Sequence, residues 1–513
     1  MRRWQSYYEI LYFPLVLLYI ACILKGMSGL ILSPSFQLFF KISNEWVIRF
    51  AEMFRYLGYY LIQLFPFLVL IKILSRRYED SVPVFIGVVS YILLNITTMF
   101  FSKGTLQPSF YFSELGLQVD SSTLSAGGNG MRYPIAMGFL AVFIAAGLTR
   151  YFYMRSRKAP ASGSFSFINR DASALINTGV ITILIGIAVA YGWPYLIDLL
   201  NLIFRFIAED ISNPINLFVY GCVEKIMSVL DLETLLHSRF WYGELGGSWI
   251  NNSVVYFGDI PIWTAQQAAG VYNTGFGRLI TPYYIYNIFV APAIILATFK
   301  TFTDKIEKNK YVIFMILSIL LSIICGNMLP FDLYLLIMTP LFFFFHVITS
   351  GLVYATLEAL NIHLGYSFAG QMYMANPGSV IDLLTIIRNT NLEMVIIKAA
   401  GVGIAFAVIY YLILHQYYEN WCLDFLGTGK KDEYVDNFIK AVGGLENIRK
   451  IYASPTKIIL QVEDSGLLNF RMMKSQGVYK VVESRTTYDI CYGAISYLLA
   501  KEVNKRMESD EEV

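Results

Sequence analysis

The chain has 513 residues, of which 56% are hydrophobic and only 15% are charged, and its formal net charge is +2. Because an ordinary water-soluble domain carries about 25% charged residues, this composition excludes a chain that is soluble throughout. The near-neutral charge also argues against a nucleic-acid partner. Five cysteines are scattered without metal-binding or disulfide spacing, so we expect unpaired packing residues, no metal site and no cofactor.

Long apolar runs dominate the chain up to residue 415. A helix needs about 20 residues to cross a hydrocarbon core of about 30 Å, and these runs have about that length. Inside lipid, such runs satisfy their backbone polar groups by forming helices. The sequence therefore predicts a polytopic α-helical membrane protein. The runs cover 10–24, 56–74, 84–101, 134–153, 175–200, 281–299, 311–329, 333–354 and 394–414.

Lysine and arginine placement predicts the orientation of these segments. Residues 150–170 hold five basic residues and no acidic one, and residues 300–310 hold four basic against two acidic. Basic loops face the cytoplasm, so we expect both segments on that side. The loop 102–133 is poor in basic residues and is expected outside.

Residues 204–275 are the least regular part of the membrane region. They are too polar for helices that face lipid and too apolar for an aqueous domain. Such segments survive at membrane depth only where protein buries them or where they line a cavity, so we expect the substrate path here. The ionisable residues of this stretch are Asp210, Glu224, Lys225, Asp231, Glu233, His237, Arg239, Glu244 and Asp259.

After residue 415 the composition changes sharply. Residues 416–433 contain Gly427, Gly429 and a charge run, which is typical of a linker. Residues 434–513 read as a helix, two strands, a second helix, two further strands and a final helix. We therefore predict a small C-terminal α/β sandwich domain, which would be cytoplasmic.

Five segments resemble one protein family, in its order. These are FVYGCVEKIMSVLDLETLLHSRFWY, GDIPIWTAQQAAGVYNTGF, CGNMLPFDLYLLIMTPLFFFFHVITSG, NFIKAVGGLENIRKI and GVYKVVESRTTYDICYG. Together they are similar to an enzyme IICB permease of the bacterial phosphoenolpyruvate sugar phosphotransferase system, in the glucose superfamily. The resemblance implies an enzyme IIC-like transport domain over 1–415 and an enzyme IIB-like domain over 434–513.

The same resemblance implies further properties. It predicts about ten transmembrane helices with re-entrant hairpins near 240–280 and 360–390, and a ligand cavity near the middle of the bilayer. It also predicts a homodimer in the bacterial cytoplasmic membrane, and docking of an enzyme IIA-like phosphocarrier protein. The substrate class it implies is a sugar or sugar-like small molecule.

The departures from the family fall on its phosphate chemistry. The family passes phosphate through a cysteine thiolate, which is a good nucleophile and a good leaving group. Here that position is Ser454, whose hydroxyl has no comparable acidity. Cys491 aligns with a buried strand residue and is not expected to replace the thiolate. Ser454 is therefore a catalytic candidate only by its position.

The sugar site also departs from the family. Glu233 and Thr234 occupy the positions of a histidine pair that the resemblance places at the sugar. Leu329 replaces a glutamate, and a leucine can neither bond a sugar hydroxyl nor take its proton. Asp332 keeps an acid at the second glutamate position, and Asn327 precedes it. We therefore expect a protein that does not phosphorylate what it binds.

Several residues have a structural alternative beside the functional one. Glu233 and His237 are four apart and share a helix face, so they could form a salt bridge or contact a ligand together. Trp241 could stack on a sugar ring or anchor its helix at the membrane interface. Asp332, beside the helix-breaking Pro330, is expected to line the cavity. Glu244 and Asp259 could simply cap turns, and His346 is expected to be a packing residue.

The sequence is compatible with two functions. The first is a sugar permease that translocates its substrate without phosphorylating it. The alternative is a non-transporting membrane sensor or regulatory protein that derives from such a permease.

Overall fold

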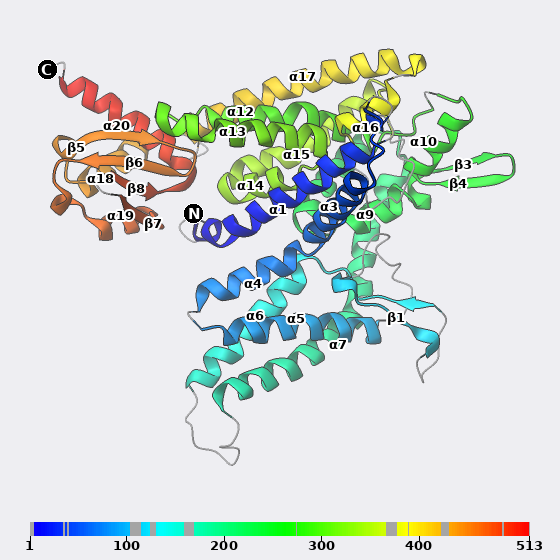
Figure 1. Ribbon diagram of the computed structural model, residues 1–513, viewed down its shortest axis with the longest axis horizontal. Helices are drawn as coiled ribbons and strands as arrows, with labels where there is room; N and C mark the ends of the chain where they lie inside the picture. The colour runs from blue at the N-terminus through cyan, green and yellow to red at the C-terminus, as the bar shows by residue number, and fades with distance from the viewer. Residues whose placement is uncertain are drawn as a thin grey trace.

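The computed structural model describes residues 5–33, 36–37, 40–78, 80–102, 114–123, 130–158, 169–272, 274–365, 377–387, 389–421, 430–484 and 487–511. Figure 1 shows a body of helices with a small α/β unit at one end and the β3–β4 hairpin at the opposite end. The helices α5, α6 and α7 form a group at one side of this body.

The helical body follows the order of the chain. Its first part contains α1 (Gln5–Leu32), α3 (Glu45–Gln63), α4 (Phe65–Arg77), α5 (Val82–Phe101), α6 (Phe139–Lys158), α7 (Arg170–Glu209), α8 (Pro214–Val229), α9 (Glu233–Phe240) and α10 (Asp259–Ala268). Its second part contains α11 (Thr281–Tyr284), the π-helix η4 (Ile285–Val290), α12 (Ala291–Phe299), α13 (Lys305–Leu320), the π-helix η5 (Leu321–Cys325), α14 (Leu329–Met338), α15 (Pro340–Ala359), α16 (Val380–Ile386) and α17 (Glu393–Gln416).

Within the described residues, seven helices are long and apolar enough to cross a membrane, and the pair α3 and α4 forms an eighth span if its bend of 58° is counted as one crossing. The fold is thus a polytopic helical membrane protein, as predicted. The number is below the expected ten or so. The helix over the run 134–153, α6, is not among these spans, since it ends in Arg155, Arg157 and Lys158. The run 333–354 is counted, but its span begins only at Pro340, because Thr339 has a non-helical backbone and separates α15 from α14.

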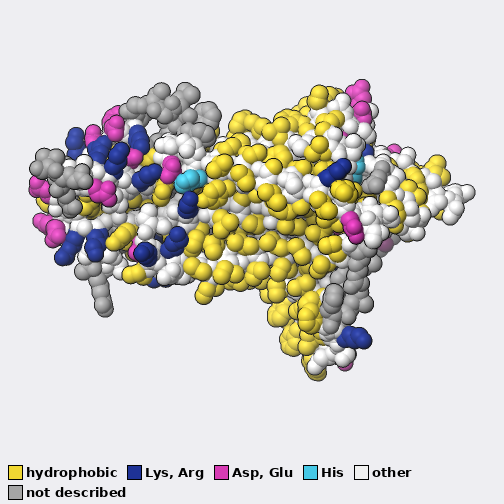
Figure 2. Space-filling model, turned by 90° about the horizontal axis from the view of Figure 1, so that it is seen from above, with side chains coloured by type: hydrophobic (Ala, Val, Ile, Leu, Met, Phe, Trp, Pro, Cys, Tyr) yellow, Lys and Arg dark blue, Asp and Glu magenta, His cyan; other side chains and the backbone are white. Residues whose placement is uncertain are grey.

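The helical body is apolar on its outside. Figure 2 shows hydrophobic side chains over the middle of the molecule, whereas lysine, arginine and acidic side chains gather at the end that holds the α/β unit. Ile313 and Phe314 of α13 are 70% and 54% exposed, and Leu202 of α7 is 64% exposed. Exposed apolar side chains on this scale fit a surface that faces lipid.

Two segments were expected to form re-entrant hairpins. Residues 240–280 instead hold an exposed β-hairpin of β3 (Ser248–Asn251) and β4 (Val254–Phe257), followed by α10. The segment 360–390 contains α16, and its residues 366–376 lie outside the described part of the chain. A second short hairpin, β1 (Val119–Asp120) with β2 (Met131–Arg132), lies in the loop predicted to be outside.

The C-terminal unit is a small α/β sandwich, as predicted. Its antiparallel sheet has the order β5-β6-β8-β7, and α20 packs on β5 and β6 while α18 packs on α19 and α20. The predicted linker 416–433 is helical at 416–421 and again from 430, and 422–429 lie outside the described residues. The elements are α18 (Lys430–Ala441), β5 (Ile448–Ala453), β6 (Lys457–Val462), α19 (Phe470–Gln476), β7 (Lys480–Ser484), β8 (Thr487–Cys491) and α20 (Ser496–Glu511).

Candidate functional site

The centre of the membrane region is organised by the close approach of α8 and α15. A Cβ atom on Gly221 of α8 would lie 2.9 Å from the carbonyl oxygen of Ser350. A Cβ atom on Gly351 of α15 would lie 2.5 Å from the carbonyl oxygen of Phe218. Small residues let membrane helices pack this closely. This packing sets the polar residues of α8 beside those of α14 and α15.

The first part of the site is a buried chain of charged and aromatic groups. The Lys225 ammonium lies 3.2 Å from Asp332 Oδ2, and His346 Nε2 lies 3.0 Å from Asp332 Oδ1. His346 Nδ1 lies 2.7 Å from the Tyr410 hydroxyl, so three helices and α17 meet here. The Lys225 ammonium also lies 4.7 Å from the ring centre of Tyr286. Asp332 and His346 are 0% exposed, so the ion pair is wholly inside the protein.

The helix break that was predicted at Pro330 positions Asp332. The chain leaves η5 through Gly326, whose φ of 59° is left-handed, and restarts as α14 at Leu329. Asn327 Oδ1 accepts the Leu329 N–H at 2.9 Å, so this predicted ligand residue supports the turn that leads into α14. Asp332 was expected to line a cavity; here Lys225 and His346 enclose it.

The second part of the site lies on α8, α9 and α11. The Tyr283 hydroxyl donates to Glu224 Oε1 at 2.5 Å and lies 3.3 Å from His237 Nε2. His237 stacks on Trp241, with ring centres 3.6 Å apart and planes at 13°. Trp241 in turn donates from Nε1 to the Tyr220 hydroxyl at 3.0 Å. Trp241 is 6% exposed, which does not fit the alternative of an interface anchor.

Glu233 connects the two parts. It is the first residue of α9, is partly buried, and lies within electrostatic reach of Glu224, Lys225 and Asp332. Thr234 follows it and is also partly buried. We call Glu224, Lys225, Glu233, His237, Asp332 and His346 the central polar cluster.

Of the residues predicted from the sequence, His237 stacks on Trp241, and Glu233 lies within electrostatic reach of Asp332. Sequence reasoning assigned no individual role to Glu224, Lys225 or Tyr283. A signal was present, because Glu224 and Lys225 are adjacent ionisable residues inside an otherwise apolar helix. An ionisable residue in a membrane segment is a functional candidate by default. The tyrosines carried no such signal, since tyrosine is abundant throughout this chain.

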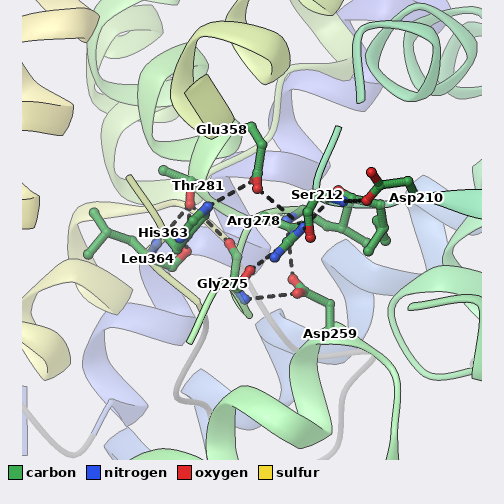
Figure 3. Close-up of polar contacts among 12 residues, drawn as sticks. Asp210, Ser212, Asp259, Gly275, Arg278, Thr281, Glu358, His363 and Leu364 are labelled. Atoms are coloured by element: carbon green, nitrogen blue, oxygen red, sulfur yellow. Dashed lines mark hydrogen bonds and ion pairs between the residues drawn. The ribbon is translucent and has the colours of Figure 1, made fainter. Parts of the chain in front are cut away.

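A separate buried cluster, the arginine clasp, surrounds Arg278 (Figure 3). Arg278 Nη1 lies 3.3 Å from Glu358, and it donates to Ser212 Oγ at 2.8 Å and to the Ile211 carbonyl at 2.7 Å. His363 Nε2 lies 2.9 Å from the second oxygen of Glu358. The arginine clasp therefore connects the loop before α11 to the end of α15 and to the α7–α8 connection.

Asp259 belongs to the same region and has a structural role. Its two carboxylate oxygens accept the backbone N–H groups of Gly277 and Leu279, at 2.8 Å and 3.1 Å. This supports the turn-capping alternative for Asp259. Glu244, the other residue with that alternative, lies in a single 3₁₀ turn beside α9.

Replacing Arg278 with methionine is expected to destabilise the protein by about 3–5 kcal/mol, because the buried Glu358 would lose its permanent cation and keep only His363 beside it. Thermal unfolding of the purified protein in detergent measures this loss. Arg239→Met is the matched control, since Arg239 is exposed and its replacement should change the unfolding temperature little. Equal unfolding temperatures for the two variants would show that the clasp is not structural.

The loop around Ser454 corresponds in sequence to the phosphate-acceptor loop of the family. Ser454 is 3% exposed, and both its backbone N–H and its hydroxyl donate to the Lys457 carbonyl, at 2.9 Å and 3.3 Å. Pro455 has no N–H to offer. The Ala453 N–H is also occupied, because it donates to Thr303 Oγ1 at 2.8 Å. A phosphate-binding loop needs backbone N–H groups that point at the anion, and these three positions supply none.

The neighbouring groups do not restore phosphate chemistry. Cys491 lies opposite Lys457 in the β6–β8 pair, but burial and then the nearby Asp489 raise the pKa of its thiol. A thiol with a raised pKa is a poor nucleophile at neutral pH. The Lys457 ammonium is bonded to Asp489 at 2.6 Å, so its charge is already paired.

The acceptor loop is attached to the helical body. Besides the bond to the Ala453 N–H, the Thr303 N–H donates to the Ala453 carbonyl at 3.1 Å. Lys501 of α20 lies 2.9 Å from Glu419, which follows α17. The segment 300–310, predicted to be cytoplasmic, thus contacts the α/β unit, as does the segment that follows α17.

The described residues contain no group of three or more histidine, cysteine, aspartate or glutamate side chains arranged to hold a metal ion.

Comparison with known proteins finds relatives of this chain both in sequence and in structure. The glucoside-specific EIICBA component of the PTS system from Staphylococcus carnosus (strain TM300) is 26% identical over 346 residues, which are 65% of this chain and 48% of the relative. The chain therefore spans about half the length of the relative it matches. One structural neighbour is the transporter ChbC, the IIC component of the N,N'-diacetylchitobiose-specific phosphotransferase system, with 13% identity, a TM-score of 0.31, and coverage of 79% of this chain and 90% of that one.

No family model matches the sequence. The relative, together with the helical membrane fold, supports the resemblance drawn from the sequence motifs. The chain is related to the permeases of the phosphotransferase system.

Proposed function

We propose that this protein translocates a sugar or sugar-like solute across the membrane without phosphorylating it. The observation that supports the absence of phosphorylation is the Ser454 loop, where the acceptor hydroxyl is buried and the N–H groups of Ala453 and Ser454 are bonded elsewhere. A neutral serine hydroxyl in this setting is neither an activated nucleophile nor a good phosphate donor.

The central polar cluster supports the proposed translocation of a sugar or sugar-like solute. It lies where α8, α9 and the broken helix η5–α14 meet, and discontinuous helices of this kind build the substrate sites of many transporters. Carboxylates, a histidine and the ring of Trp241 are groups that bond sugar hydroxyls or stack on a sugar ring. Leu329, at the position of a family glutamate, supplies no base for phosphoryl transfer.

The assembly and location belong to the same proposal. We expect a homodimer in the bacterial cytoplasmic membrane, with the C-terminal unit on the cytoplasmic side. The contact between Thr303 and Ala453 favours that side, because it joins the unit to a basic loop. An enzyme IIA-like phosphocarrier protein could dock there, but it would find no competent acceptor at Ser454.

Counterflow in proteoliposomes tests the proposal. Vesicles loaded with unlabelled glucose or methyl β-glucoside should transiently take up the same labelled sugar, and the recovered label should be free sugar. Phosphoenolpyruvate with the general phosphocarrier proteins should not change that product. Recovery of a sugar phosphate would contradict the proposal, and empty liposomes give the background.

The alternative, a membrane sensor, is favoured by one observation. The two hydrogen bonds between Thr303 and Ala453 couple the α/β unit directly to the loop between α12 and α13. A movement of those helices would therefore be transmitted to the unit. A lack of counterflow with every sugar tried would favour this function over transport.

A further inference from the structure

A groove on the apolar outside of the helical body lies apart from the central polar cluster. It runs between α17 and the segment formed by η4 and α12, which pack side by side (Figure 1). Its volume is about 270 Å³, less than the roughly 300–1,000 Å³ of sites that enclose a whole small molecule. Its lining is apolar apart from one tyrosine hydroxyl, and it consists of Phe289, Ala293, Leu296, Ile404, Ala407, Val408, Tyr411 and Leu412.

Small side chains create the groove. Ala293 on α12 and Ala407 on α17 leave space between the two helices. The groove closes at one end where Phe289 packs on Gly403, since a Cβ atom on Gly403 would lie 2.4 Å from the Phe289 ring. Apolar side chains that line a groove and are also exposed fit contact with lipid. The exposed ones are Leu296, Ile404, Val408 and Leu412.

At its other end the groove reaches basic side chains. Lys300 follows Leu296 by four positions and His415 follows Tyr411 by four positions, so each basic residue continues the groove face of its helix. The Lys300 ammonium lies 5.5 Å from the ring centre of Tyr411, and the Tyr411 and His415 rings stack with centres 6.2 Å apart. From Phe289 to Lys300 the face is about 16 Å long, which is about one leaflet of a hydrocarbon core of about 30 Å. The basic end therefore lies at the depth of lipid headgroups.

The basic end carries more positive charge than its acidic neighbours balance. Lys501 Nζ and His415 Nε2 lie 2.9 Å and 3.6 Å from the same oxygen of Glu419. Glu502, the next acid on α20, is paired with a different lysine at 2.6 Å. Glu419 thus balances only one of the two lysines, Lys300 and Lys501, and protonation of His415 would add to the surplus. Positive charge at this depth attracts anionic lipid headgroups.

We propose that the groove binds one phospholipid with an anionic headgroup. An acyl chain lies between α12 and α17, and the phosphate contacts Lys300, with His415 and Lys501 beside it. A zwitterionic phospholipid would fill the apolar part equally well, but its own cationic group would meet the surplus positive charge. Because Lys501 belongs to the α/β unit, the lipid binds at the junction between that unit and the helical body. The site does not depend on the proposed transport function, since no residue of the central polar cluster lines it.

Native mass spectrometry of the purified full chain in detergent tests the headgroup. Wild type mixed with equal amounts of phosphatidylglycerol and phosphatidylcholine, with identical acyl chains, should retain phosphatidylglycerol about fivefold more often as its first lipid. Lys300→Gln should lower this preference about fivefold, to near equality. Lys310→Gln is the matched control, because Lys310 is an exposed lysine of the same basic segment and does not line the groove. It should keep the wild-type preference.

Ala407→Phe tests the groove itself. The added ring would fill the space between α12 and α17, so the retained first lipid should be lost whichever headgroup it carries. Leu202→Phe is the matched control, since it places a ring on α7, at an exposed apolar position outside the groove. Lys300→Gln keeps the proposal testable if Ala407→Phe does not fold, because Lys300 is exposed.

Three results would overturn the proposal. The first is equal retention of the two lipids by wild type. The second is a phosphatidylglycerol preference that survives in Lys300→Gln or in Ala407→Phe. The third is a wild-type dimer that retains no lipid and that Ala407→Phe dissociates, which would assign the groove to a second copy of the chain.

Discussion

Replacement of Lys225 by methionine is expected to destabilise the protein by about 3–5 kcal/mol, because Asp332 would be left as a buried charge without its cation. His346 would remain 3.0 Å from Asp332, and only its protonated form could neutralise the carboxylate. The loss is measured by thermal unfolding of the purified protein in detergent, or by the fraction that stays monodisperse after heating.

The double variant Lys225→Met with Asp332→Asn separates charge from packing. Removing both charges leaves an asparagine oxygen for His346, so most of the lost stability should return. Lys310→Met is the control for loss of a lysine, since Lys310 is exposed and its pair with Glu307 is a surface pair worth about 0–1 kcal/mol. A double variant as unstable as Lys225→Met would show that the methionine fails to fit, and the ion pair would not be the cause.

The fold was largely readable from the sequence because its main signals are local. Runs of apolar residues predicted the long helices, and Pro330 predicted the break that precedes α14. The alternation of helix and strand signals after residue 434 predicted the α/β unit, down to its final helix α20. The sequence did not predict where some apolar runs are interrupted. The break at Thr339 is an example, since the residues on both sides of it are equally apolar.

The candidate site was predicted only in part because its contacts are not local. Lys225 and Asp332 are 107 residues apart, and Arg278 and Ser212 are 66 apart. No spacing rule pairs such residues, and an isolated arginine such as Arg278 looks like any membrane-flanking cation. The i,i+4 relation of Glu233 and His237 was a local signal, yet His237 is held by Tyr283 and Trp241, which tertiary packing supplies.

The close packing of α8 on α15 is another feature that could not be predicted from the sequence. Gly221 and Gly351 are ordinary glycines in the sequence, and only the structure shows that a side chain at either would meet backbone atoms. That contact sets Lys225 beside Asp332 and His346. The chemistry of the central polar cluster thus depends on two residues that carry no chemistry themselves.

A cysteine placed at Ser454 is expected not to restore phosphorylation. The thiol would occupy a buried position beside N–H groups that are already bonded to Lys457 and Thr303, and burial raises the pKa of a thiol. After incubation with labelled phosphoenolpyruvate and the phosphocarrier proteins, Ser454→Cys should carry no more label than Ser454→Ala. Trypsin digestion and mass spectrometry would locate any label on the α/β unit.

The attachment to the helical body gives this expectation a sharper form. Ser454→Cys combined with Thr303→Val removes the side chain that holds the Ala453 N–H, so the loop gains one free donor and part of its mobility. Label on this double variant but not on Ser454→Cys would identify the attachment as the barrier to the phosphocarrier. Even then the sugar should remain unphosphorylated, because Leu329 offers no base in the membrane region. Label on the single variant Ser454→Cys would show instead that the loop opens readily. The missing acceptor cysteine would then be the one change that prevents phosphorylation of the α/β unit.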